Sequence, residues 1–141
     1  MKKGVDYVGV GVGALIKNEN NEYFLSKRGM GCRNEVGTWE FPGGGVEFGD
    51  SLEETIIREM DEEYNLKIKV LDLVKTVDHM IPNESQHWVA ITFLCEIVSG
   101  EPHINEPDKC SQIGWFSLHE IESMNLSIIS RDGFNWLKDH L

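Results

Sequence analysis

Apolar positions along the chain fall into short runs that polar turns separate. The segment 7–16 is rich in valine and glycine, and the polar turn 18–21 divides it from the apolar run 23–25, so we expect a β-hairpin. Further short apolar runs predict strands at 39–41, 67–77, 88–95 and 115–116. The polar segments between these strands predict loops at 29–37, 78–86 and 100–109.

The segment 51–63 has helical periodicity instead. Ser51 is a favourable N-cap, and Glu54 three residues later completes a capping box. Apolar side chains then recur every four residues and form the core stripe Leu52, Ile56, Met60 and Tyr64. Shorter patterns predict helices at 118–124 and 131–141. Strands and helices mix in a single domain over residues 1–141, which predicts an α/β or α+β fold.

Three carboxylates, Glu59, Glu62 and Glu63, occupy relative positions 0, 3 and 4 of this helix and therefore point one way. Glu59 and Glu63 lie within about 20 degrees of Leu52 around the helix axis, so we expect them to face the edge of a cleft. The segment 47–63 holds eight acids and one base. A hard divalent cation such as Mg²⁺ would relieve the repulsion and bind substrate phosphates. The pattern predicts a magnesium site for phosphate chemistry.

The overall charge is acidic, with 13 Lys and Arg against 24 Asp and Glu and a formal net charge of -11. Such a surface repels nucleic acid polymers and anionic membranes, which bind clustered basic residues. The three cysteines lie far apart without a zinc-binding pattern, as in a reduced, cytoplasmic protein. We find no secretory signal and no apolar run of the roughly 18 residues that a membrane span needs.

The segment 44–66 resembles the nudix box, G-x5-E-x7-R-E-U-x-E-E-x-G-U, in which U is aliphatic. The matching residues are Gly44, Asp50 (in place of Glu), Arg58, Glu59, Met60, Glu62, Glu63, Asn65 (in place of Gly) and Leu66. This resemblance implies a nudix α/β/α sandwich around a central mixed β-sheet. It also implies hydrolysis, with Mg²⁺ or Mn²⁺, of a nucleoside diphosphate linked to some further group.

The resemblance also implies a role for each matching residue. Arg58 would orient one of the box carboxylates, and Asp50 would support the same network. One box glutamate would act as general base, for which we choose Glu62. The implied metal ligands are Glu59, Glu62 and Glu63 with the backbone carbonyl of Gly44.

The departures from the family pattern differ in their expected effect on the site. Asn65 tolerates the left-handed backbone that ends a helix, and Asp50 shortens a supporting carboxylate by one methylene. In several family members a further glutamate before the Trp-Phe strand reaches the metals, and here that position is Gly114. Glu106 and Asp108 in the preceding loop are the candidates to replace it.

Three substrate classes are compatible with the sequence. The segments 37–44, 47–51 and 106–110 resemble the MutT homologue 2 subgroup, which cleaves nucleoside triphosphates to the monophosphate and pyrophosphate, and we favour this reading. An ADP-ribose or ADP-sugar pyrophosphatase is the first alternative, because Pro82 lies 16 residues after Leu66, about where that class has a proline. A non-catalytic nucleotide sensor is the second, although such domains usually lose box carboxylates.

Five further residues are candidates to contact a small-molecule nucleotide. Arg28 and Arg33 flank the loop before Trp39 and could reach phosphates, with ordinary surface charge as the alternative. Trp39 or Phe48 could stack on a base, with core packing as the alternative. His87 stands where the MutT homologue 2 relatives begin a His-Tyr-Val strand. Nudix proteins of this size are often dimers, so a homodimer is compatible with the resemblance.

Overall fold

The computed structural model describes residues 1–140, apart from the side chain of Pro82. Its strands are β1 (Gly9–Lys17), β2 (Tyr23–Arg28), β3 (Trp39–Glu40), β4 (Gly43–Gly45), β5 (Lys67–Ile81), β6 (Gln86–Ser99) and β7 (Cys110–Phe116). They form one sheet in the order β3-β2-β1-β6-β5, with β4 paired to β1 and β7 paired to β2. The pairing of β1 with β6 is parallel and the others are antiparallel, so the sheet is mixed, as expected.

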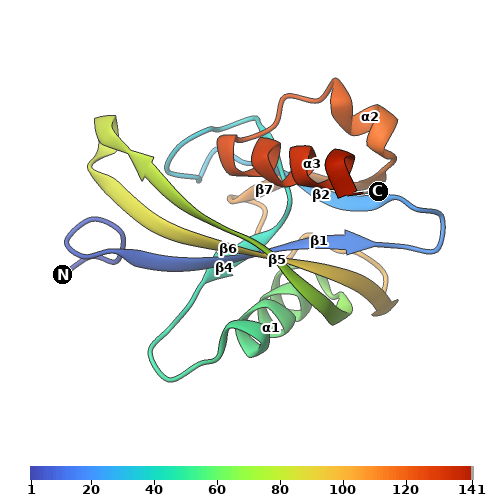
Figure 1. Ribbon diagram of the computed structural model, residues 1–141, viewed down its shortest axis with the longest axis horizontal. Helices are drawn as coiled ribbons and strands as arrows, with labels where there is room; N and C mark the ends of the chain where they lie inside the picture. Colours follow the sequence, from blue (N-terminus) through green and yellow to red (C-terminus); the bar gives the residue numbers. More distant parts are fainter. Residues whose placement is uncertain (141) are drawn as a thin grey trace.

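Helices cover both faces of this sheet. They are α1 (Leu52–Tyr64), α2 (Leu118–Glu122) and α3 (Ile128–His140), and a short 3-10 turn, η1 (Pro82–Glu84), joins β5 to β6. Figure 1 shows α1 on one side of the sheet and α2 with α3 on the other. This is the expected three-layer sandwich. Within the described part of the chain, no helix has the length and apolarity to cross a membrane.

The core consists of two apolar clusters, one on each face of the sheet. Alternation along β1 divides its side chains between them: Ala14 and Ile16 pack in the cluster beneath α1, and Leu15 packs in the cluster beneath α3. From α1, Ile56 and Met60 are fully buried in the first cluster, which confirms the predicted stripe. Burial of alternate residues in the strands, and of residues four apart in the helix, therefore holds the sheet between the two helix layers.

The termini of α1 are capped by side-chain and backbone bonds. Ser51 accepts a hydrogen bond of 3.1 Å from the backbone N–H of Glu54, which is one half of the predicted capping box. Asn65 ends the helix with a φ of 60°, and its backbone N–H donates to Asp61. The expectation that Asn65 takes over the left-handed position of the family glycine is confirmed.

The predicted loop 78–86 is wrong. β5 continues to Ile81 and β6 begins at Gln86, so that only η1 separates them, and His79 pairs with Trp88 across the hairpin. β5 lies at the edge of the sheet and exposes many of its side chains. The end of this strand therefore lacks the apolar pattern from which a strand is predicted. Pro82 opens the 3-10 turn, a position that suits a residue without an N–H.

Three smaller boundaries also differ from prediction. The glycines 43–45, which no predicted strand includes, form the short strand β4, because they pair with β1. β7 starts at Cys110, five residues before the apolar Trp115, because Cys110 and the exposed Gln112 still pair with β2. α3 begins at Ile128 and is described to His140, and the predicted end at Leu141 lies outside the described residues.

Candidate active site

A glycine strand and the acidic helix form one wall of a cavity. β4 carries Gly44 directly against Glu59 of α1: a β-carbon on residue 44 would lie 2.8 Å from Glu59 Cδ. One residue earlier, a β-carbon on Gly43 would lie 2.1 Å from the Val12 carbonyl oxygen of β1. Glycine is required at position 43, where the neighbouring atom belongs to the backbone, whereas a side chain at position 44 would displace the Glu59 carboxylate.

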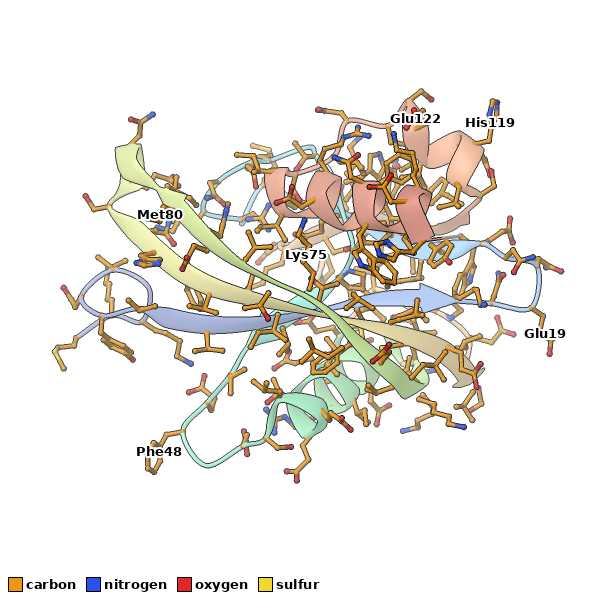
Figure 2. All side chains as sticks on the ribbon, in the orientation of Figure 1. Glu19, Phe48, Lys75, Met80, His119 and Glu122 are labelled. Carbon is orange, nitrogen blue, oxygen red and sulfur yellow. The ribbon has the colours of Figure 1, made fainter. Side chains whose placement is uncertain are left out.

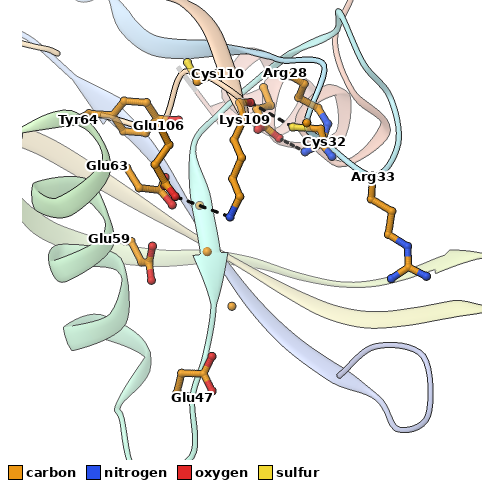
Figure 3. A pocket seen from close by; sticks show the side chains of 15 residues that line it. Arg28, Cys32, Arg33, Glu47, Glu59, Glu63, Tyr64, Glu106, Lys109 and Cys110 are labelled. Carbon is orange, nitrogen blue, oxygen red and sulfur yellow. Dashed lines mark hydrogen bonds and ion pairs between the residues drawn. The ribbon is translucent and has the colours of Figure 1, made fainter. Parts of the chain in front are cut away.

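The cavity beside this wall has a volume of about 510 Å³ and contains both signs of charge. Figure 3 shows Glu59 and Glu63 projecting from α1 on one side, with Lys109 reaching down beside Glu106. Arg33 enters from the loop between β2 and β3. The charged lining residues are Glu40, Glu47, Glu59, Glu63, Glu106, Arg28, Arg33 and Lys109. Glu59 and Glu63 thus face the cleft, as the helix periodicity predicts.

The loop between β6 and β7 is fastened to the end of α1, which brings Glu106 to this cavity. The Asn105 side chain donates to the Glu62 carbonyl at 2.7 Å, and the Asn105 backbone N–H donates to the Glu63 carbonyl at 3.1 Å. Glu106, one residue further, lines the cavity and pairs with Lys109 at 3.7 Å. Of the two candidates to replace the glutamate missing at Gly114, Glu106 is therefore the one that reaches the cavity.

Crowding of carboxylates perturbs the protonation of Glu63. Burial raises the pKa of Glu63 to about 9, and a hydrogen bond and charge repulsion from Glu59 add to the rise. Glu106 acts in the same direction, and Lys109 opposes it. Without a cation, the folded protein therefore holds a proton at this carboxyl near neutral pH.

Arg58, Asp50 and Glu62 form a second group beside the cavity. Arg58 Nη1 bonds to Asp50 Oδ2 at 3.0 Å, and Arg58 Nε lies 3.9 Å from Glu62 Oε1. The hydrogen bond to Asp50, followed by its charge, raises the pKa of Arg58. The Glu62 side chain is 63% exposed and is not among the residues that line the cavity. The 3.0 Å bond shows that Asp50, although one methylene shorter than the glutamate of the family pattern, still reaches Arg58.

The donor chemistry of the cavity fits a hard divalent cation. Glu59, Glu63 and Glu106 offer carboxylate oxygens in one confined space, and Mg²⁺ and Ca²⁺ prefer such ligands. Among the described residues, no three His, Cys, Asp or Glu side chains already converge on one point. The raised pKa of Glu63 reflects this crowding of carboxylates.

The family follows from comparison with known proteins. The model of the nudix domain matches residues 8–137. The chain belongs to the nudix family. This confirms the membership predicted from the box, and nudix hydrolases generally use divalent metal ions.

Individual relatives include proteins of the MutT type. The 8-oxo-dGTP diphosphatase of Escherichia coli K12 is 32% identical over 88 residues, which are 62% of this chain and 66% of that protein. The ADP-ribose pyrophosphatase of Methanocaldococcus jannaschii is 28% identical over 127 residues, 90% of this chain and 64% of the relative. The chain spans less than two thirds of the length of these curated relatives.

A solved structure confirms the nudix fold. The MutT nudix hydrolase from Burkholderia pseudomallei has a TM-score of 0.84 and 32% identity, and the match covers 93% of this chain and 98% of that one. The expected sandwich around a mixed sheet is therefore shown both by the strand order and by this likeness.

The candidate substrate residues of this nudix domain lie in different places. Arg28 and Arg33 both line the cavity, but Arg28 is paired with Glu40 at 2.9 Å. Trp39 packs edge-to-face against Phe116 with ring centroids 5.1 Å apart, in the cluster beneath α3. Core packing therefore accounts for the tryptophan, and its role in base stacking stays an untested prediction.

Phe48 and His87 lie away from the cavity. Phe48 is fully exposed in the loop between β4 and α1, where Figure 2 shows it pointing outward from the body. His87 contacts Asp78 across the β5–β6 hairpin at 3.1 Å. Neither residue lines the cavity in this conformation.

Sequence reasoning missed Glu40 and Lys109. Glu40 is half-buried in the short strand β3, where desolvation raises the pKa of its carboxyl against the opposing charge of Arg28. A charged residue between Trp39 and Phe41 was the available signal, since buried charges need partners. Lys109 had no such signal, because loop lysines are usually solvated.

Proposed function

We propose that this nudix protein hydrolyses nucleoside triphosphates to the monophosphate and pyrophosphate with Mg²⁺. The observation that carries the proposal is the division of charge in the cavity: the α1 carboxylates face Lys109 and Arg33. A polyphosphate needs both a cation held by carboxylates and direct basic contacts along its length. The similarity to an 8-oxo-dGTP diphosphatase supports this substrate class.

The chain's own residues would hold and orient the reactants. Glu59, Glu63 and the Gly44 carbonyl would hold the cation together with Glu62, and Glu106 would complete the ligand set from the opposite loop. Bound Mg²⁺ supplies neutralisation of phosphate charge and Lewis acidity. Mn²⁺, with the same preference for oxygen, is the proposed substitute.

Glu62 is the proposed general base, oriented by Arg58. Its carboxylate lies beside the cavity on the same helix turn as Glu59 and Glu63 and must rotate inward to accept a proton from the attacking water. Arg58, held in place by Asp50, would limit the rotamers of Glu62. Lys109 and Arg33 would bind the phosphates that leave as pyrophosphate, because neither has to give up a buried ion pair.

Product analysis tests the proposal. The purified protein with Mg²⁺ is supplied with nucleoside triphosphates, ADP-ribose and ADP-sugars, and the products are separated. Monophosphate plus pyrophosphate is expected, with loss in Glu62→Gln and Glu63→Gln. Glu54→Gln, on the exposed side of the same helix, is the matched control and should keep full activity. Release of orthophosphate, or no turnover of triphosphates, would contradict the proposal.

An ADP-ribose or ADP-sugar pyrophosphatase is the second candidate. The likeness to the Methanocaldococcus jannaschii enzyme, which extends over 90% of this chain, supports it. AMP plus a sugar phosphate in the same assay would establish this class. Binding without turnover of any compound would indicate the nucleotide sensor.

We further propose a cytoplasmic location and a homodimer. Cys32, Cys95 and Cys110 are free thiols, and burial raises the pKa of Cys95 to about 12, which keeps it unreactive in a reducing compartment. Light scattering after size exclusion tests the dimer, and an elution mass near 16.0 kDa would contradict it.

A further inference from the structure

Arg28 is held by the loop between β2 and β3 as well as by Glu40. Its Nη1 donates to Glu40 Oε1 at 2.9 Å. Its Nε and Nη2 donate to the backbone carbonyl and the side-chain oxygen of Asn34, both at 2.9 Å. The guanidinium therefore has fixed partners on two sides, and Asn34 supplies two of the three bonds.

Asn34 is in turn bound by the tip of the β5–β6 hairpin. Its side-chain amide donates to Glu84 Oε2 at 2.9 Å, and Glu84 lies in η1 at that tip. The network continues inward along the hairpin, because Gln86 Nε2 lies 3.5 Å from the same Glu84 oxygen and Trp88 Nε1 donates to Gln86 at 3.0 Å. Hydrogen bonds thus connect the hairpin to the half-buried Glu40 through residues 50 positions apart in the sequence.

The network lies along a second cavity that adjoins the first. This cavity, of about 390 Å³, shares Arg28, Arg33 and Glu40 with the charged cavity. One wall is the loop that contains Asn34, and the opposite wall is the hairpin, with Ile81 and Trp88. The Asn34–Glu84 bond ties these two walls together.

The chemistry of the second cavity suits a nucleobase better than a phosphate. Its lining combines the apolar side chains of Ile81, Ile129 and Trp88 with polar and charged groups that can exchange hydrogen bonds with a base. A base could stack or pack against such walls while Glu40 accepts its N–H donors. The charged cavity next to it would hold the phosphates.

We propose that Asn34 and Glu84 form a latch that positions Arg28 and Glu40 and fixes the width of the base-binding end of the cleft. They are positioning residues, because their effect on a substrate passes through Arg28 and through the distance between the two walls. The latch makes the enzyme discriminate between nucleobases. This inference rests on the proposed function, since it assumes that a nucleotide occupies the adjoining cavities.

Steady-state kinetics on a panel of nucleoside triphosphates tests the latch. Asn34→Ala and Glu84→Ala should each raise KM for the preferred base about tenfold with kcat within about twofold, and should narrow the spread of kcat/KM among bases. The double variant should be no worse than Asn34→Ala alone, because both changes break the Asn34–Glu84 bond and only Asn34→Ala also removes a bond to Arg28. Glu84→Gln keeps an acceptor oxygen and should restore the wild-type KM and selectivity.

Asn83→Ala is the matched control, because Asn83 is exposed in the same turn. It should leave KM and selectivity unchanged. Additive effects of the two latch variants, a fall in kcat alone, or an unchanged spread among bases in variants with wild-type Tm would each overturn the latch.

A readout without turnover separates this inference from the proposed function. Phenylglyoxal modifies accessible guanidinium groups, and peptide mass spectrometry reports its rate at Arg28. The rate should rise several-fold in both Asn34→Ala and Glu84→Ala and stay at the wild-type value in Asn83→Ala. An unchanged rate at Arg28 in both latch variants overturns the positioning role, whatever substrate the enzyme proves to hydrolyse.

Discussion

Gly44 lies so close to Glu59 that a β-carbon at position 44 would be 2.8 Å from the Glu59 carboxyl carbon. The strand that pairs with the centre of the sheet therefore limits where the Glu59 carboxylate of the helix can lie. This contact connects a backbone requirement of β4 to the chemistry of the cavity, and it can be tested directly.

Gly44→Ala should inactivate the protein with little effect on its stability. The added methyl group meets the flexible end of the Glu59 side chain, which can turn away at small cost. Displacement of one carboxylate by about 1 Å is expected to lower kcat/KM about 100-fold. Gly45→Ala is the control, because its β-carbon would have no neighbour nearer than 3.8 Å. Equal losses of kcat/KM in Gly44→Ala and Gly45→Ala would show that the intolerance of β4 to side chains has a cause unrelated to Glu59.

Arg58→Lys should lower activity much more than stability. Lysine lacks the planar guanidinium group with which Arg58 contacts Asp50 and Glu62 at the same time, so Glu62 loses its orientation. We expect kcat to fall about 10- to 100-fold, as for other groups that orient metal ligands, with an almost unchanged Tm. Lys67→Ala breaks the exposed pair with Asp61 and should change neither quantity. A Tm loss in Arg58→Lys that accounts for the lost activity would contradict the orienting role.

The stability of the cation-free protein should fall as pH rises. The pKa of Glu63 is raised in the folded state to about 9 from an ordinary 4.5, so the folded protein binds this proton more tightly than the unfolded chain does. The resulting stabilisation is complete below about pH 4.5 and is lost as the pH rises toward 9.

Thermal unfolding in EDTA from pH 5 to pH 9 measures this dependence. The difference in Tm between the wild type and Glu63→Gln should change by several degrees in favour of the variant as the pH rises. The difference is the relevant quantity, because the net charge of -11 lowers the Tm of both proteins alike. Mg²⁺ should raise the wild-type Tm most at high pH. A pH-independent difference would contradict the raised pKa.

Asn105→Ala should release the loop that carries Glu106. It removes the 2.7 Å bond to the carbonyl of Glu62, at a cost of about 1 kcal/mol in the free energy of unfolding. Glu106 would then occupy the cavity less often, so affinity for Mg²⁺, measured by titration calorimetry, should fall several-fold. Glu101→Gln, exposed in the same loop, serves as control. Unaltered Mg²⁺ affinity in Asn105→Ala would remove Glu106 from the proposed ligand set.

Local patterns in the sequence were sufficient for α1 and its surroundings. The buried residues Ile56 and Met60, the cap at Ser51 and the left-handed Asn65 all depend on neighbours within a few positions. The orientation of Glu59 and Glu63 toward a cleft follows from the same helical geometry.

Contacts between distant segments could not be predicted in the same way. The extension of β5 to Ile81 depends on pairing with β6 at a solvent-exposed edge, where no apolar alternation is required. The bond from Asn34 to Glu84 and the approach of Glu106 to Glu63 join residues from separate loops. Such loop positions acquire a role only after the sheet has brought the loops together.

The parallel pairing of β1 with β6 limits the order in which the chain can fold. Gly9 pairs with Trp88, so the two central strands must find each other across a sequence separation of 79 (88 minus 9). The β5–β6 hairpin and α1 can form from local contacts, whereas closing so long a loop is slow. On a ribosome, β1 leaves the exit tunnel long before its central partner exists. The acidic helix and its glycine strand therefore have no complete sheet to join until the chain has been synthesised through β7, which ends at Phe116.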